Sequence, residues 1–253
     1  MFEIFAPSYK RAIGKSTHKI LPDVTYVISE SEKDDYLKSG EHNRFWFVPP
    51  SAQGNLCRIR NYILDNSKSK KILLLDDDHT RFGRWENNKR TVVDTEQIME
   101  FIADMFELCD QGDFKFWGVL PNNDNMSYRN QSPYSLSSYV GGPWQGFNDC
   151  ALRYDENLPL KEDYDMTLQV LNKYRKLLRA NYFIYYPKQH NNTGGCAVYR
   201  NTIREVEQLK LLKKKWGSRI VKDGSKHSIG KTTDRESATE DINPTISIPI
   251  KGI

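Results

Sequence analysis

The chain has 253 residues, with 37 Lys and Arg against 33 Asp and Glu, which gives a formal net charge of +4. A hydrophobic content of 38% and a charged content of 28% exclude a disordered or fibrous chain, and the length suffices for a sizeable core. No apolar run approaches the length of a membrane span, and the first residues lack the pattern of a signal peptide. Four cysteines lie far apart without a C-x-x-C pair, so we expect a protein of the reducing cytoplasm.

Strands and helices alternate along the sequence. In chain order we expect a strand at 2–6, strands at 24–28 and 45–48, a helix at 56–66, a strand at 71–75, a helix at 95–109, a strand at 115–120, a helix at 161–180, a strand at 182–186 and a basic helix at 202–216. The run Lys71–Leu75 is uninterrupted and apolar, as in a central parallel strand. The pattern predicts an α/β fold with a mostly parallel sheet sandwiched by helices.

Positive charge is concentrated in one segment. Residues 200–231 contain ten Lys and Arg against three acids, a local charge of +7, whereas residues 1–199 carry −1 and the tail from 232 carries −2. We therefore expect a catalytic body at 1–200, a basic helical extension at 201–231 and a tail at 232–253. In the extension, the residues suited to phosphate contact or base stacking are Lys210, Lys213, Lys214, Lys215, Trp216, Arg219 and Lys222. The alternative is a docked helix whose lysines are simply solvated.

Three consecutive carboxylates, Asp76, Asp77 and Asp78, directly follow the predicted buried strand. Like charges this close repel each other unless a cation or hydrogen-bond donors offset them. In open α/β sheets, ligands bind at the carboxyl ends of strands, and two or three carboxylate oxygens suit Mg²⁺ or Mn²⁺ bridging to ligand phosphates. The alternative is an acidic turn with no ligand.

A second acidic group, Glu162 and Asp163, opens the predicted helix at 161–180. Acids at this position favour the helix by capping and by interaction with its dipole. They also suit a general base held at a helix end. His190 lies in a polar loop and is a candidate metal ligand, in competition with His79; Arg11, Arg58 and Arg60 are candidates to offset phosphate charge.

The order of these motifs resembles a glycosyltransferase of the GT-A fold. Pro7-Ser8-Tyr9-Lys10-Arg11 looks like the nucleotide-binding loop of that fold, Asp76-Asp77-Asp78 looks like its D-x-D strand end, Glu162-Asp163 looks like its acceptor-side motif, and the segment 190–200 looks like its C-terminal metal loop. These motifs span about 7–200. Among such enzymes the chain is most similar to the TET/JBP-associated glycosyltransferases, many of them phage-encoded.

This resemblance implies a UDP-sugar donor, with UDP-glucose expected, and an acceptor that is a hydroxymethylated pyrimidine in double-stranded DNA. It implies Mn²⁺ or Mg²⁺ held by Asp78, with Asp76 and His190 as further ligands, and inverting displacement with Asp163 as base and Glu162 as second choice. Donor contacts are expected from Pro7, Ser8, Tyr9, Arg11, Arg58, Arg60, Asp76, Asp77, Gly142 and Trp144.

Other functions use the same residues. A UDP-sugar transferase acting on a polysaccharide or protein, a metal-dependent nuclease or phosphotransferase, and a silent DNA-binding module are the alternatives. The aromatic residues Tyr128, Tyr134, Tyr139 and Trp144 suit either an acceptor pocket or the core. Because a hydroxymethyl group inside a duplex is hard to reach, base flipping is the expected route to it.

Overall fold

The computed structural model describes residues 1–87, 89–121, 128, 130–187, 195, 200–224 and 242–249. The helices are α1 (Lys33–Ser39), α2 (Leu56–Asn66), α3 (Thr95–Gly112), α4 (Glu162–Tyr174) and α5 (Thr202–Trp216). The strands are β1 (Glu3–Pro7), β2 (Thr25–Ser29), β3 (Phe45–Val48), β4 (Lys71–Leu75), β5 (His79–Glu86), β6 (Lys89–Val93), β7 (Phe116–Val119), β8 (Tyr134–Ser135), β9 (Trp144–Asn148), β10 (Leu178–Ala180), β11 (Phe183–Pro187), β12 (Val221–Lys222) and β13 (Thr245–Ile246).

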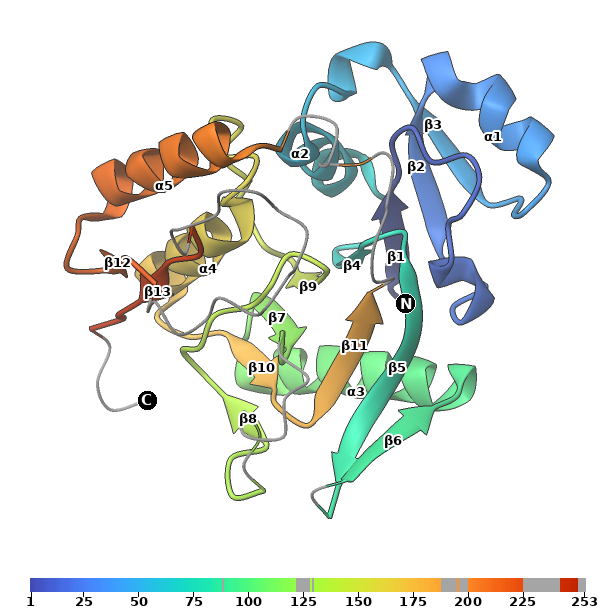
Figure 1. Ribbon diagram of the computed structural model, residues 1–253. Helices are drawn as coiled ribbons and strands as arrows, with labels where there is room; N and C mark the ends of the chain where they lie inside the picture. Colours follow the sequence, from blue (N-terminus) through green and yellow to red (C-terminus); the bar gives the residue numbers. More distant parts are fainter. Residues whose placement is uncertain are drawn as a thin grey trace.

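The central sheet has eight strands in the order β3-β2-β1-β4-β9-β7-β10-β8 (Figure 1). Strands β3, β2, β1 and β4 pair in parallel, as do β7 and β10. Strand β9 lies antiparallel between β4 and β7, and β8 lies antiparallel at the edge. The sheet confirms the predicted α/β fold with a mostly parallel sheet between helices.

Alternate residues of the central strands face two different layers of helices. Ile4 and Ala6 of β1 join the core that α3 covers, whereas Phe5 between them joins the core that α2 and α4 cover. This alternation follows from the period of two of an extended strand. Because both faces are buried, these strands are apolar almost throughout, and their carboxyl ends are where polar side chains can gather.

The structure corrects the predicted helix at 161–180. Helix α4 ends at Tyr174, Arg175 takes a left-handed conformation with φ 64°, and Leu178–Ala180 form strand β10. Leu178 therefore contributes to the sheet by pairing with Trp117 of β7 and not to a helical stripe. Other elements had no sequence prediction. They include α1, the central strand β9 and the hairpin of β5 and β6, which pairs with β11 in a separate antiparallel sheet.

Helix α5 packs on the outside of α4. Leu209 and Leu212 of α5 form a small apolar cluster with Leu168 of α4, and Lys161 forms a buried ion pair with Glu205. Strands β12 and β13 form a short antiparallel ribbon at the end of α5 (Figure 1). Among the described residues, no helix has both the length and the apolar character that crossing a bilayer requires.

Candidate functional site

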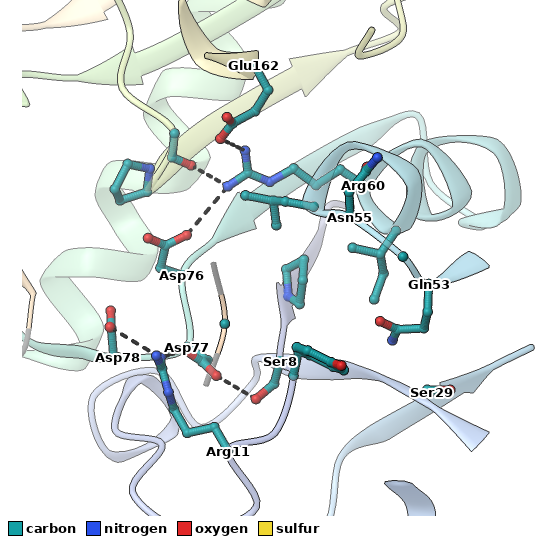
Figure 2. Close-up of a pocket in the computed structure, with 18 of the residues that line it drawn as sticks. Ser8, Arg11, Ser29, Gln53, Asn55, Arg60, Asp76, Asp77, Asp78 and Glu162 are labelled. Carbon is teal, nitrogen blue, oxygen red and sulfur yellow. Dashed lines mark hydrogen bonds and ion pairs between the residues drawn. The ribbon is translucent and has the colours of Figure 1, made fainter. Parts of the chain in front are cut away.

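A cavity of about 710 Å³ opens at the carboxyl ends of β1, β2 and β4, where the N-termini of α2 and α4 also lie (Figure 2). It is lined by five carboxylates and three guanidiniums. The sequence-predicted residues that line it are Pro7, Ser8, Tyr9, Arg11, Arg60, Asp76, Asp77, Asp78, Gly142, Glu162 and Asp163. The fold thus brings both predicted acidic groups to one cavity, although about 85 residues of chain separate them.

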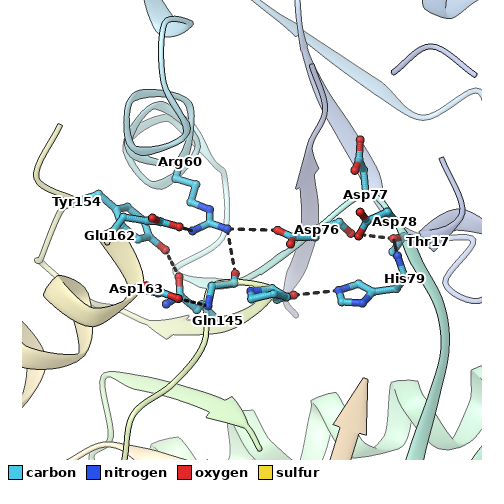
Figure 3. Close-up of polar contacts among 12 residues, drawn as sticks. Thr17, Arg60, Asp76, Asp77, Asp78, His79, Gln145, Tyr154, Glu162 and Asp163 are labelled. Atoms are coloured by element: carbon cyan, nitrogen blue, oxygen red, sulfur yellow. Dashed lines mark hydrogen bonds and ion pairs between the residues drawn. The ribbon is translucent and has the colours of Figure 1, made fainter. Parts of the chain in front are cut away.

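The backbone of the acid trio is anchored by the loop that follows β1. The Thr17 hydroxyl donates to the Asp76 carbonyl at 2.7 Å and accepts from the His79 N–H at 3.1 Å (Figure 3). The Ser16 N–H donates to the Asp77 carbonyl at 2.9 Å. These bonds satisfy backbone groups just beyond the strand end and so fix the direction of the three side chains.

Asp77 is held inside the protein. Its carboxylate accepts hydrogen bonds from the Ser8 hydroxyl and from the Arg11 guanidinium, and the residue is 5% exposed. Burial raises the pKa of Asp77, while the charge of Arg11 and the Ser8 hydroxyl oppose that rise. The Ser8 hydroxyl is itself placed by the Tyr36 hydroxyl at 2.8 Å. Asp77 therefore ties the loop after β1 to the end of β4.

Asp78 stands next to this ion pair. Arg11 Nη1 lies 3.2 Å from its Oδ2. Burial, together with the charges of Asp76 and Asp77, raises the pKa of Asp78 to about 7, and Arg11 opposes this. One guanidinium between two carboxylates leaves the trio with excess negative charge, which is the condition that a bound cation relieves.

Arg60 joins the two acidic groups. This side chain from α2 is 1% exposed, and it contacts Asp76 Oδ1 at 3.4 Å, Glu162 Oε1 at 3.2 Å and the Gly142 carbonyl at 2.9 Å (Figure 3). Its guanidinium carbon lies 5.4 Å from the centre of the Tyr154 ring. The sequence offered Arg60 as a phosphate-binding residue, and in the structure its charge is already shared between two carboxylates.

Glu162 is the first residue of α4 and is 7% exposed. Burial, with a contribution from the Asp163 charge, raises the pKa of Glu162 to about 8, and Arg60 works against the rise. A carboxylate with such a raised pKa binds a proton more strongly than an ordinary one. Gly142 allows this close packing, since a Cβ there would lie 3.2 Å from Glu162 Oε1.

Asp163 is surrounded by donors. Its Oδ2 accepts from the Tyr139 hydroxyl and from the Gly142 N–H at 3.1 Å, and its Oδ1 accepts from the Tyr164 N–H at 2.8 Å. Three donors occupy its oxygens, whereas Glu162 receives the Arg60 guanidinium. The two acids of the motif therefore have different surroundings at the same cavity.

Of the two histidine candidates, the structure describes His79, which is not among the residues that line the cavity. His79 is fully buried beneath the trio, and its Nε2 lies 3.0 Å from the Pro143 carbonyl, to which it donates. Its Nδ1 has no hydrogen-bond partner among the described residues. Burial lowers the pKa of His79. His190 lies outside the described residues.

The side chains at the cavity supply some of the ligands that a divalent cation needs, but not all of them. Asp76 and Asp78 both line the cavity, and the lining carboxylates outnumber the guanidiniums. In the described part of the chain, no group of three or more His, Cys, Asp or Glu side chains is arranged to hold a metal by itself. A cation held by Asp76 and Asp78 therefore needs further oxygen ligands from a substrate or water, as Mg²⁺ commonly has.

Two residues predicted to contact the sugar nucleotide do not line the cavity. Trp144 is fully buried in the α3 core and is not among the residues that line the cavity. Arg58 is near the cavity rim but points to Glu156, with its Nε 3.1 Å from Glu156 Oε2, and is not a lining residue either. Whether Trp144 and Arg58 line the cavity depends on which face of the strand or helix points toward it. The local sequence gives little sign of that.

The cavity also has walls that sequence reasoning did not find. Ser29 at the end of β2 and Gln53 and Asn55 before α2 line it. Arg200, the last residue of the segment 190–200 that the resemblance singled out, lines it as well. Asn55 caps α2 by accepting from the Arg58 N–H at 2.9 Å. Ser29 and Asn55 could have been found from one signal in the sequence, because each is a polar residue at a predicted strand end or helix N-cap.

The seven residues predicted to contact phosphates or stack on bases divide into two groups. Lys215 lies 2.7 Å from Asp155 and 2.9 Å from Asp165, Trp216 Nε1 donates to Asp165 at 2.7 Å, and Lys213 pairs with Asp223. These residues hold α5 against the rest of the protein. The others are exposed and form no ion pair with any described residue: Lys210, Lys214, Arg219 and Lys222.

Comparisons with known proteins give likenesses of structure. No family model and no curated protein matches the sequence. The structure is similar to the 1–349 fragment of S. aureus TarS, with 14% identity and a TM-score of 0.47 over 85% of this chain, and the chain spans 64% of that fragment. It is also similar to CMP:2-keto-3-deoxy-manno-octonic acid synthetase complexed with CTP, with 9% identity, a TM-score of 0.42 and coverage of 85% of this chain and 99% of that chain. At these TM-scores neither likeness identifies a family or an activity.

Proposed function

We propose that this protein is a metal-dependent glycosyltransferase that moves a sugar from a UDP-sugar, with glucose as the expected sugar, to a hydroxymethylated pyrimidine in DNA. The observation that carries the proposal is the cavity of about 710 Å³ with two acidic groups on it. Asp76 and Asp78 suit the donor side, and Glu162 and Asp163 suit the acceptor side. A nucleoside diphosphate sugar fits the volume of such a cavity.

The donor side has the means to hold a diphosphate. Asp76 and Asp78 would hold Mn²⁺ or Mg²⁺, which supplies positive charge where negative charge develops on the departing diphosphate. Arg11 is kept beside Asp77 and Asp78 and lines the same wall, so its guanidinium offers a further donor to phosphate oxygens. Tyr9 and Pro7 belong to the loop that Asp77 fixes, and this loop would enclose the nucleotide.

On the acceptor side, we favour Glu162 over Asp163 as the general base. The acceptor hydroxyl oxygen forms a bond to the anomeric carbon, the bond from that carbon to the diphosphate oxygen breaks, and the hydroxyl proton passes to the carboxylate. Glu162 suits this role because its raised pKa favours proton uptake. The Asp163 oxygens already accept three hydrogen bonds, so Asp163 suits the task of shaping the site. Direct displacement of this kind inverts the configuration.

The acceptor is the less supported part of the proposal. The exposed cations Lys210, Lys214, Arg219 and Lys222 favour a polyanion, since charges of this kind attract phosphates. Lys213, Lys215 and Trp216 support it less, because they pair with acidic residues of the protein itself.

The test is a transfer assay with nucleoside mass spectrometry. The protein is incubated with UDP-glucose and Mn²⁺ and with duplex DNA that carries hydroxymethylcytosine, hydroxymethyluracil or unmodified bases. We expect a hexose mass gain on a hydroxymethylated base and none on unmodified DNA. Transfer to a polysaccharide or protein in place of DNA would contradict the acceptor, and strand cleavage would indicate a nuclease. Failure to bind any UDP-sugar would contradict the whole proposal.

A further inference from the structure

A second cavity, of about 420 Å³, is lined by Tyr139, whose hydroxyl donates to Asp163. Ser137, Ser138 and Tyr139 line it from the segment before β9, Tyr164 lines it from α4, and Arg179 lines it from β10. Residues Pro244, Ile246 and Ile248 close it from the segment around β13. Neither the transfer chemistry nor the nucleotide site uses this cavity.

Arg179 gives this cavity its charge. Its Nε donates to Asn181 Oδ1 at 2.8 Å and its Nη1 donates to the Tyr139 carbonyl at 2.8 Å, so both partners are neutral. No described carboxylate lies within ion-pair distance of it. Burial lowers the pKa of Arg179 to about 10, and no acid among the described residues opposes that effect. A partly buried guanidinium without a counter-charge is costly unless a ligand supplies the anion.

The walls around Arg179 are firmly built. The Tyr139 and Tyr164 rings stack with centroids 4.3 Å apart and planes at 15°. The carbonyl of Tyr139 accepts from Arg179, and its hydroxyl donates to Asp163, which lines the first cavity. One tyrosine thus stands between the second cavity and the proposed acceptor side of the first. The Ser137 and Ser138 side chains line the same space as the guanidinium and offer hydroxyl donors.

The ribbon that borders the second cavity has exposed basic residues on it and next to it. Ile246 of β13 lines the cavity and pairs with Val221 of β12, and the next residue of β12, Lys222, pairs with Thr245. Lys222 is exposed on this ribbon, and Arg219 is exposed in the turn that precedes it.

We propose that Arg179 and the two serines bind a backbone phosphodiester of the polynucleotide acceptor, adjacent to the nucleotide that receives the sugar. This inference rests on the proposed function and adds to it a specific anchoring site for the acceptor. A guanidinium paired with neutral acceptors recognises a phosphate oxygen by charge-assisted hydrogen bonds, and hydroxyl donors beside it complete the contact.

Two substitutions at Ser138 test the proposal without touching Arg179. Ser138→Asp puts a carboxylate beside the guanidinium, where it competes with phosphate, and Ser138→Asn has almost the same shape without the charge. Binding of a short labelled duplex with a hydroxymethylated base is measured without donor. We expect Ser138→Asp to weaken binding about tenfold, a change of about 1.4 kcal/mol. Ser138→Asn, which loses the hydroxyl but adds no charge, should weaken binding less than Ser138→Asp does, and thermal unfolding checks that both variants fold.

A neutral backbone linkage identifies the contact. A duplex with one methylphosphonate beside the modified base should bind the wild type more weakly and should make no difference to Ser138→Asp. Equal affinities of the wild type and both variants would overturn the proposal, as would no duplex binding at all. A third result would also overturn the proposal: inorganic phosphate competes in the wild type but not in Ser138→Asp, while the affinity for the duplex is unchanged. That result would show a site for free anions. If Ser138→Asp does not fold, Ser137→Asp makes the same test.

These measurements are separate from the transfer reaction. Because no UDP-sugar is present, loss of transfer activity leaves the binding result unaffected. If the wild type transfers sugar to DNA but Ser138→Asp keeps its full affinity for the duplex, the anchoring site is wrong and the transferase proposal stands. If the site binds phosphodiesters but the protein uses no UDP-sugar, the anchoring site stands and the transferase proposal is wrong.

Discussion

The first cavity is lined by five carboxylates and three guanidiniums, whereas the described residues of the second cavity include one guanidinium and no carboxylate. In the first, Arg11 and Arg60 are engaged with carboxylates of the protein. In the second, Arg179 has neutral partners. The charge that the protein leaves unbalanced has opposite sign in the two places.

This difference indicates what each cavity accepts. An excess of buried negative charge is relieved by a cation, and an excess of positive charge is relieved by an anion. Arginine by itself therefore says little about phosphate binding, because its role depends on which charges the fold has already placed around it. The hydrogen bond from Tyr139 to Asp163 joins the two environments.

Replacing each arginine by methionine should separate the two environments by stability. Arg60→Met leaves the buried Glu162 and the Asp76 carboxylate without their guanidinium, and breaking such a pair costs about 3–5 kcal/mol. Arg179→Met removes two hydrogen bonds to neutral oxygens, for a cost of about 1–2 kcal/mol. Urea unfolding of the two variants measures both values. Equal losses would contradict the view that Arg60 balances charge and Arg179 does not.

Asp78→Asn tests whether the excess negative charge of the first cavity holds a cation that sugar transfer needs. We expect transfer to fall about a hundredfold, equivalent to about 2.7 kcal/mol in the barrier, because the variant weakens the hold on the cation. Asp149→Asn is the matched control, since Asp149 is exposed and its φ of 47° is one that asparagine adopts readily. Full transfer by Asp78→Asn in the mass-spectrometric assay would remove Asp78 from the metal site.

Local signals in the sequence predicted several elements with their observed ends. Helix α2 begins after Asn55, whose side chain caps it, and α5 begins after Asn201, which does the same. Strand β4 is a continuous apolar run that ends at the first aspartate. In each case the residues that determine the element lie within it or next to it.

Elements that depend on distant pairing were missed or wrong. Residues 178–180 continue the apolar spacing of α4, but their pairing with β7 and β8 makes them a strand. The functional site shows the same division between features set by adjacent residues and features set by distant contacts. The acid trio was found because its members are adjacent, whereas the contact between Arg60 and Glu162 joins residues 102 apart in sequence. The counter-charge of each arginine is a tertiary property, and single-sequence patterns do not encode it.

The pH dependence of stability tests the buried Glu162. Its pKa is raised in the folded protein, to about 8, from an unfolded value of about 4.3. The folded state therefore binds more protons between these values, so the contribution of Glu162 to stability is complete below about pH 4.3 and is lost as the pH rises through about 8.

Glu162→Gln should remove that loss. The unfolding free energy of the variant, minus that of the wild type, should increase by at least about 1.4 kcal/mol across this range, the equivalent of a tenfold change in proton affinity. Urea unfolding at several pH values measures it, with Glu156→Gln as a control at an exposed carboxylate. A difference that is independent of pH would mean that Arg60 fully offsets the burial of Glu162. The same variant should also lose transfer activity if Glu162 is the base.

The smallest effect concerns two neighbouring lysines of α5. Lys214 is exposed without an ion pair to any described residue, whereas Lys213 pairs with Asp223. A free lysine that contacts a phosphate contributes about one unit to the slope of log affinity against log salt concentration. Lys214→Gln should therefore lower the slope for duplex DNA more than Lys213→Gln, because the pair with Asp223 must break before Lys213 can contact a phosphate. Equal slopes for the two variants would mean that surface ion pairs do not decide which lysines meet the polyanion, and that the contrast between balanced and unbalanced charge holds only for the buried groups.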